Sequence, residues 1–178
     1  DNDAYVCAPI HASVSGTVTG IVEVLLPTGA KCPAVEITSD GKMTPDPSIQ
    51  PHPVSSTEEL VAAARASGLV GLGGAGFPAH VKLSPKPGTK LDTLIINGAE
   101  CEPYITADYR ECIEHADDIM EGVYRIKELM GFDRVIIGVE DNKPEAIRIL
   151  HEIAADKRDT NDSVNLLQLK SQYPQGAE

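Results

Sequence analysis

The stretch "RVIIGVE", residues 134–140, limits the possible folds more than any other part of the sequence. It is apolar on both faces of an extended chain, as strands of parallel sheets are. Two similar apolar runs occur elsewhere, "LDTLIING" at 91–98 and "VNLLQLK" at 164–170. Helical patterns fill both intervals. The order βαβαβ therefore predicts an α/β fold, a Rossmann-like parallel sheet with right-handed crossovers.

The segments between these strands have the periodicity of amphipathic helices. In "DYRECIEHADDIMEGVYRIKELMG", apolar residues recur every three or four positions. They predict one long helix with Thr106 as its N-cap and Gly131 as the residue that ends it. The segment "NKPEAIRILHEIAADK" predicts a second helix, with Asn142 as its cap and Pro144 in its first turn. An earlier helix is expected after the serines at 55–56, each of which has a glutamate three residues later.

Residues 1–45 predict a small all-β module in front of the α/β fold. The stretch "ASVSGTVTGIVEVLL" alternates small polar and β-branched residues, and "LPTGAKCPAVEITSDGK" predicts a turn, a strand and a turn. Four prolines between positions 45 and 53 indicate an extended linker over residues 46–56. Residues 57–178 are expected to be one α/β domain. We expect the β module to be incomplete and the α/β domain to be truncated at its C-terminus.

The composition excludes several classes of function. The formal net charge is −12, aromatic residues make up 4% of the chain and Trp is absent, which argues against a nucleic-acid partner. No apolar run approaches the ~20 residues that span a bilayer, so no direct membrane span is expected. The four cysteines show no metal-ligand spacing, which predicts free thiols and no metal site: Cys7, Cys32, Cys101 and Cys112.

The glycine-rich stretch "GLVGLGGAGFP", residues 68–78, contains the pattern G-x-G-x-x-G at Gly71, Gly73 and Gly76. A dinucleotide fingerprint needs a strand before these glycines, but here a predicted helix precedes them and ends at Gly68. No G-K-[ST] follows, so a Walker loop is also excluded. Two interpretations stay open: a backbone surface for a planar or phosphorylated ligand, and a hinge.

A second polar stretch, "INGAECEPYITADYR" at 96–110, directly follows a predicted buried strand. Ligands of α/β sheets bind at the carboxyl ends of the strands, so its side chains are candidates for a site. Glu100 and Glu102 can act as a paired acid and base, or accept hydrogen bonds from ribose or ribityl hydroxyls. The same residues also suit a solvated loop that leads into a helix.

Together, "GLVGLGGAGFPAHVKL" and "IINGAECEPYITADYR" resemble the flavin-binding subunit of respiratory complex I and its relatives. With "GAECEPY" and the terminal "YPQGAE", the chain is more similar to the C subunits of Rnf electron-transport complexes. The stretch "APIHASVSGTVTGI" resembles the barrel-sandwich module of those subunits. The resemblance covers essentially the whole chain, and it implies a complex I flavoprotein-like fold.

In these relatives the glycine loop packs along FMN, and NADH stacks on the flavin. The resemblance assigns cofactor binding to Gly71, Gly73, Gly74, Ala75, Gly76, Phe77, Lys82, Asn97, Glu100, Glu102, Gly176 and Glu178. It implies no catalytic acid or base. Two positions depart from the family pattern: Leu72 replaces an arginine, and Ala99 replaces an aspartate that touches the flavin.

The resemblance further implies an ion-translocating oxidoreductase that exchanges electrons between NAD(H) and ferredoxin. The 4Fe–4S clusters of such a protein lie outside this chain, so the isolated chain is expected to be inactive. Other subunits of a membrane electron-transport complex are the implied partners, and they hold the protein at the cytoplasmic face of the cell membrane. Two alternatives share these motifs: a cobalamin-reductase-type flavoprotein of a diol-degrading microcompartment, and a scaffold domain without flavin.

Overall fold

The structure is a computed structural model that describes residues 4–50, 53–72, 75–86, 88–100, 102–156, 164–174 and 176. The chain divides into two compact units. The N-terminal unit is Asp1–Val54 with Glu58–Ser84, and the C-terminal unit is Ser55–Thr57 with Pro85–Glu178. The boundaries expected from the sequence, at residues 45 and 56, stay a prediction.

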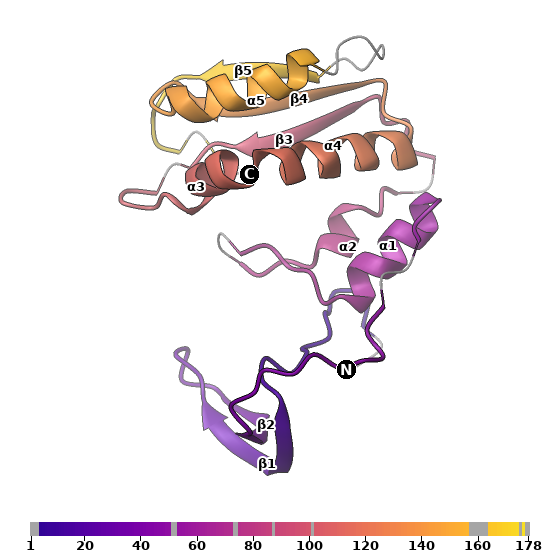
Figure 1. The fold of residues 1–178 in the computed structure, drawn as a ribbon, viewed down its shortest axis with the longest axis vertical. Helices are drawn as coiled ribbons and strands as arrows, with labels where there is room; N and C mark the ends of the chain where they lie inside the picture. The colour runs from indigo at the N-terminus through magenta and orange to yellow at the C-terminus, as the bar shows by residue number, and fades with distance from the viewer. Residues whose placement is uncertain are drawn as a thin grey trace. The chain divides into compact units, whose positions relative to one another are not determined.

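The C-terminal unit is built on a parallel sheet of three strands (Figure 1). Strands β3 (Thr93–Gly98), β4 (Arg134–Glu140) and β5 (Val164–Leu169) lie side by side in that order. Both pairs are parallel, which confirms the sheet predicted from the three apolar runs. The central strand β4 is buried from Ile137 to Glu140, because it has a neighbour on each side and helices against one face.

Three helices connect these strands: α3 (Ala107–Glu114), α4 (Ala116–Met130) and α5 (Pro144–Asp156). Figure 1 shows α4 and α5 lying side by side along the sheet. Their apolar faces and one face of the sheet form a single core, in which burial of apolar surface is the main stabilising term. The buried residues of this core are Ala116, Met120, Val123, Val135, Ile137, Val139, Ala146, Leu150, Ala154 and Val164.

The prediction of one long helix over residues 108–131 is wrong, because the helix is interrupted at His115, whereas the predicted N-cap position of Thr106 is confirmed. The backbone of His115 has φ −128° and ψ 31°, outside the helical region. Its N–H donates to Glu111 O at the end of α3, and its carbonyl accepts from Ile119 N–H at the start of α4. Asp residues at 117–118 favour a helix N-terminus at this point. The predicted end is confirmed, since Gly131 has φ 71° and follows α4 directly.

Helix α5 begins at Pro144, whose missing N–H is harmless in a first turn. The carbonyl of Lys143 accepts the first helical hydrogen bond, from Ile147 N–H at 3.2 Å. Lys143 therefore occupies the N-cap position, and the prediction that Asn142 does so is wrong.

The N-terminal unit contains a two-stranded antiparallel hairpin, β1 (Gly16–Leu25) with β2 (Lys31–Ser39). Both strands occur where the sequence predicts them, with a bulge between Val18 and Gly20. Gly16 is required there, because a Cβ atom would lie 2.1 Å from Thr38 O across the hairpin. The barrel-sandwich arrangement expected for this region stays a prediction.

Two helices complete the N-terminal unit. Helix α1 (Thr57–Ala66) begins directly after the predicted serine caps and carries glutamates in its first turn. It ends before Gly68, which adopts φ 70°. The glycine loop follows and leads into the short helix α2 (Ala79–Lys82).

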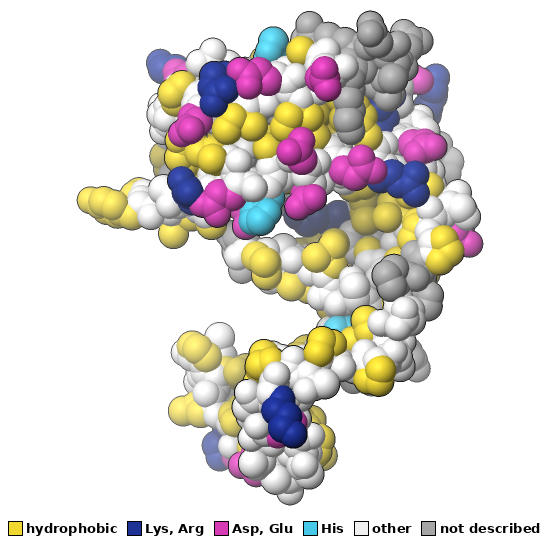
Figure 2. Space-filling model, viewed as in Figure 1, with side chains coloured by type: hydrophobic (Ala, Val, Ile, Leu, Met, Phe, Trp, Pro, Cys, Tyr) yellow, Lys and Arg dark blue, Asp and Glu magenta, His cyan; other side chains and the backbone are white. Residues whose placement is uncertain are grey.

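The charged residues of the chain are spread over its surface. Figure 2 shows acidic side chains scattered among Lys and Arg over the face that carries the helices of the C-terminal unit.

None of the helices in the described ranges is long and apolar enough to cross a membrane. Three cysteines are free thiols, Cys7, Cys32 and Cys112, while Cys101 lies outside the described residues.

Candidate functional site

The glycine loop is closed at its base by backbone hydrogen bonds. The N–H of Gly71 donates to Phe77 O at 2.9 Å, and the N–H of Ala79 donates to Leu69 O at 2.9 Å. Val70 and Pro78 form an antiparallel bridge between these two bonds. The preceding element is helix α1, so the exclusion of a Rossmann dinucleotide loop holds.

The described residues next to the tip of this loop are small or exposed. Ala75 and Gly76 are exposed, and Gly76 has φ 63° with nothing within 4 Å of the position that a Cβ would take. Phe77 is 40% exposed and Leu72 is 93% exposed. Gly73 and Gly74 lie outside the described residues. An open backbone surface beside an exposed aromatic ring suits a flat ligand.

Residues 4–9 contact the chain at both ends of the glycine loop. His80, just after the loop, is 2% exposed, and its Nε2 lies 2.9 Å from Tyr5 O. Gly68, just before the loop, leaves no room for a side chain, since a Cβ would lie 2.3 Å from Pro9 O. Arg65 reaches the carbonyl of residue 4 at 3.1 Å. Both ends of the loop therefore rest on residues 4–9.

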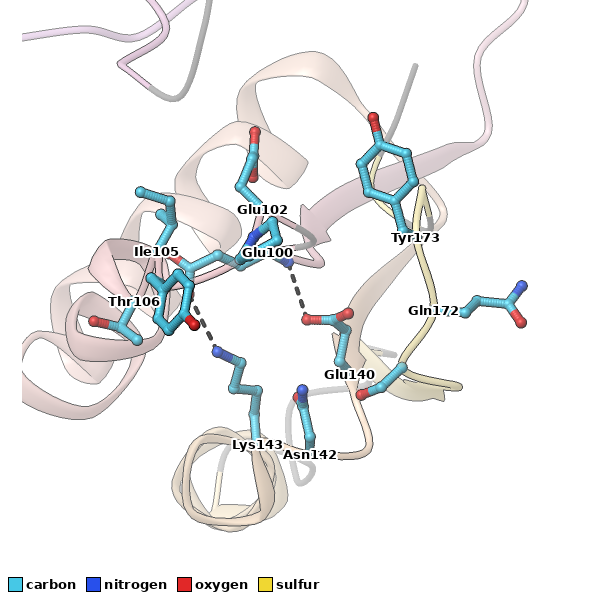
Figure 3. Close-up of a pocket in the computed structure, with 12 residues that line it drawn as sticks. Glu100, Glu102, Ile105, Thr106, Glu140, Asn142, Lys143, Gln172 and Tyr173 are labelled. Carbon is cyan, nitrogen blue, oxygen red and sulfur yellow. Dashed lines mark hydrogen bonds and ion pairs between the residues drawn. The ribbon is translucent and has the colours of Figure 1, made fainter.

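The loop after β3 forms the second candidate region, within the C-terminal unit (Figure 3). The Glu100 side chain is 2% exposed, and both of its carboxylate oxygens have partners. Oε1 accepts from the N–H of Asp108 at 2.9 Å, and Oε2 lies 3.3 Å from Lys143 Nζ. Thr106 occupies the N-cap position of α3 without a side-chain cap bond in the described structure, so Glu100 satisfies a helix N–H in its place.

Sequence reasoning missed two residues of this network, Glu140 and Lys143. Glu140 is 3% exposed at the end of β4, and its Oε2 accepts from Glu100 N–H at 3.3 Å. The Lys143 side chain is 13% exposed, and its ammonium lies 5.0 Å from the centre of the Tyr109 ring. A signal existed, because an acid that ends a buried parallel strand lies at the sheet edge where ligands bind.

Asn97 and Gly176 meet at the same edge of the sheet. The Asn97 side-chain amide donates to Gly176 O at 3.0 Å, and its oxygen accepts from Ala99 N–H at 3.1 Å. A Cβ at Gly176 would lie 2.5 Å from Ala99 O, so only glycine fits this approach. Asn97 thus joins the loop after β3 to the segment after β5.

These segments line an open pocket of about 340 Å³. Its lining comes from residues 100 and 102–106, from 140 and 142–143, and from 171–173. Among the described residues of this lining, Lys143 is the one cation, beside three carboxylates. Such a pocket accepts hydrogen bonds from hydroxyl or amide donors and disfavours a phosphate dianion.

Two groups near this sheet edge, Asp108 and Cys112, have raised pKa values. Loss of water and then the negative charges of Glu100, Glu102 and Glu111 raise the pKa of Asp108, which Lys143 partly offsets. Burial, followed by the charge of Asp108, raises the pKa of the Cys112 thiol, so this cysteine is a protonated, poor nucleophile at neutral pH.

The structure thus groups part of the predicted site. Asn97, Glu100, Glu102 and Gly176 gather at one sheet edge of the C-terminal unit. The described glycine-loop residues and Lys82, which ends α2, belong to the N-terminal unit. Glu178 lies outside the described residues.

A parallel sheet whose strand edge carries polar side chains is typical of α/β domains that bind ligands at that edge. Family comparison makes this specific: residues 64–178 match the Nuo51 FMN-binding domain, and the chain belongs to that family. Residues 1–42 match the RnfC barrel sandwich hybrid domain. The resemblance seen in the two sequence motifs is confirmed.

Curated relatives include the C subunits of three complexes. Over 99% of this chain, the identity is 43% to the C subunit of a proton-translocating ferredoxin:NAD(+) oxidoreductase complex from Clostridium ljungdahlii. It is 41% to the C subunit of a Na(+)-translocating ferredoxin:NAD(+) oxidoreductase complex from Acetobacterium woodii, and 37% to that of an ion-translocating oxidoreductase complex from Pseudomonas aeruginosa. The chain spans 38%, 40% and 23% of these three proteins, respectively.

Proposed function

We propose that this chain binds FMN and NADH as the flavin-site part of an ion-translocating ferredoxin:NAD oxidoreductase. The observation that carries the proposal is the match of residues 64–178 to the Nuo51 FMN-binding domain, in a chain similar over 99% of its length to C subunits of such complexes. The complex I flavoprotein-like fold and the barrel-sandwich module are part of the same proposal.

The residues present fit FMN. The described residues of the glycine loop, 71–72 and 75–77, are exposed, and Gly76 has a conformation that disfavours side chains, which supports contact with a flat ring. In the strand-edge pocket, the exposed carboxylate of Glu102 suits hydroxyl groups. Because the pocket is acidic, we assign the phosphate to backbone N–H groups of the glycine loop and to Lys82.

When bound, FMN supplies the exchange between two-electron and one-electron transfer. The chain's own residues bind and orient FMN and NADH. Phe77, 40% exposed, offers an apolar face beside the loop, and Glu102 offers an exposed carboxylate on the side proposed for NADH. No side chain is proposed as an acid or base.

The rest of the activity is proposed to lie outside this chain. We propose that the chain is part of a longer protein, because it spans only 38% of its Clostridium ljungdahlii relative. The 4Fe–4S clusters are assigned to other parts of that longer protein, and ferredoxin to the role of redox partner. We propose that the other subunits of the complex hold the protein at the cytoplasmic face of the membrane. The names of the relatives, which describe subunits of ion-translocating complexes, support the proposal of other subunits as partners.

Titration of FMN into the 178-residue chain and into the longer protein that contains it tests the proposal. We expect saturable quenching of flavin fluorescence at one equivalent. If flavin is not bound by either protein, the proposal is wrong and the flavin-free scaffold interpretation is favoured.

NADH oxidation with an artificial acceptor, measured on the longer protein, tests the assignment of Glu102. Glu102→Ala is expected to lower kcat/KM for NADH by about tenfold or more, because an exposed acceptor on the NADH side is lost. Glu152→Ala, which removes an exposed glutamate of α5, is the matched control and should leave the rate unchanged. Equal rates for Glu102→Ala and the unaltered protein would show that Glu102 is not part of the NADH site.

A further inference from the structure

We propose that Glu100, Glu140 and Lys143 form a charged clamp that positions the loop of residues 102–106 for the flavin site. These three are positioning residues, and the inference rests on the proposed function. The clamp is defined by three contacts that join the ends of two neighbouring strands and the start of α3 (Figure 3).

The carboxylate of Glu100 is fully engaged by partners inside the protein. Its Oε1 accepts from Asp108 N–H at 2.9 Å, its Oε2 contacts Lys143 Nζ at 3.3 Å, and its side chain is 2% exposed. A buried carboxylate with a cation and a backbone donor is held in one orientation. Glu100 therefore acts on a ligand by fixing the loop that starts beside it.

The opposite half of the clamp is a single hydrogen-bonded turn. Glu140 ends β4, and the N–H of Lys143 donates to the Glu140 carbonyl at 3.0 Å. From this turn, Glu140 Oε2 accepts Glu100 N–H at 3.3 Å while Lys143 reaches the Glu100 carboxylate. Figure 3 shows both side chains directed at Glu100. One turn thus holds both the backbone and the side chain of Glu100.

The loop of residues 102–106 is the segment that the clamp holds. It is fixed before its start at Glu100 and after its end at Asp108, yet its middle is fully exposed at Tyr104. Tyr104 has φ 66°, a conformation that a non-glycine residue keeps only where its surroundings impose it. An exposed ring held in a disfavoured conformation between two anchors is suited to contact a ligand.

Amide hydrogen exchange by NMR on the 178-residue chain, without flavin, tests the clamp. Lys143→Met removes the charge and keeps the apolar stem, and Lys143→Arg keeps the charge. In Lys143→Met we expect the amides of Glu100 and Asp108 to exchange about tenfold faster or more, relative to core amides of α4, with recovery in Lys143→Arg. Arg148→Met, which breaks an exposed ion pair on α5, is the control and should change neither amide.

Two exchange results would overturn the clamp. In one, the amides of Glu100 and Asp108 keep their rates in Lys143→Met. In the other, they accelerate only as much as the core amides of α4, which indicates a general loss of stability and no specific hold on the loop.

Flavin titration of the same variants in the longer protein tests positioning. Lys143→Met and Glu140→Gln should each raise the Kd for FMN by about tenfold, and Lys143→Arg should restore it. Unchanged FMN affinity beside accelerated loop exchange would overturn the positioning role. If the unaltered protein binds no FMN, the proposed function fails, while the exchange experiment still decides whether the clamp exists.

Discussion

The two loops assigned to the flavin are held in place by different kinds of interaction. The glycine loop of the N-terminal unit is closed by backbone hydrogen bonds and rests on residues 4–9. The loop after β3 in the C-terminal unit is held by buried charges at Glu100, Glu140 and Lys143. Backbone contacts of the first kind tolerate changes of charge but not of shape, whereas buried charges tolerate small changes of shape but not loss of a partner.

The largest effect that tests this contrast is expected at Gly68. Gly68→Ala places a Cβ 2.3 Å from Pro9 O at a residue with φ 70°, so the chain must move and the new residue is strained. We expect the free energy of unfolding to fall by about 2–3 kcal/mol, measured by urea denaturation.

The matched control for Gly68→Ala is Gly122→Ala in α4. Nothing lies within 4 Å of a Cβ at Gly122, and its φ is helical, so this change should stabilise the chain by about 0.5–1 kcal/mol. If both variants have equal stability, the N-terminal segment does not constrain the loop.

A smaller loss is expected at His80, the other anchor of the glycine loop. Its Nε2 bonds Tyr5 O, while its Nδ1 is buried with no partner among the described residues. His80→Ala leaves the Tyr5 carbonyl without that contact and opens space, for a loss of about 1–3 kcal/mol by thermal unfolding. His151→Ala, on the exposed side of α5, should change stability by less than about 0.5 kcal/mol. An equal loss at both histidines would contradict an anchoring role for His80.

The smallest effects concern two aspartates whose pKa values move in opposite directions. The pKa of Asp108 is raised by loss of water and by its acidic neighbours, so the folded state carries a penalty above that pKa. Asp108→Asn should therefore stabilise the chain at pH 7 by a few tenths of a kcal/mol, discounted for solvent screening, and the gain should vanish as the pH falls through that pKa.

The pKa of Asp141 is shifted in the opposite direction. Hydrogen bonds from Ser171 lower its pKa, so it contributes stability above its unfolded pKa that is lost as the pH falls through the lowered value. Asp141→Asn should be less stable than the unaltered chain at pH 7, with a difference that shrinks as the pH falls through the lowered pKa. Thermal unfolding of both variants across this range checks the pair, and a common sign would show that the electrostatic account of this sheet edge is wrong.

The elements of the C-terminal unit could be predicted because their signals are local. Apolar runs predicted all three strands, and Gly131 and Pro144 marked a helix end and a helix start correctly. The interruption at His115 escaped prediction because one non-helical residue leaves the apolar periodicity on both sides nearly intact.

The supports of the candidate site could not be predicted for a different reason. The contact of His80 with Tyr5 joins residues 75 positions apart and leaves no local pattern. The contact of Glu140 with Glu100 depends on β3 and β4 being neighbours, which only the sheet order reveals. The motifs predicted which loops matter, whereas what holds them depends on tertiary structure.

Hydrogen–deuterium exchange of the longer protein with and without FMN shows whether both loops contact the flavin, since it follows both loops in one experiment. We expect slower exchange on FMN addition in residues 71–77 and in residues 100–106, with no comparable change in the β1–β2 hairpin. Saturable FMN binding that protects neither loop would show that these loops do not form the flavin site.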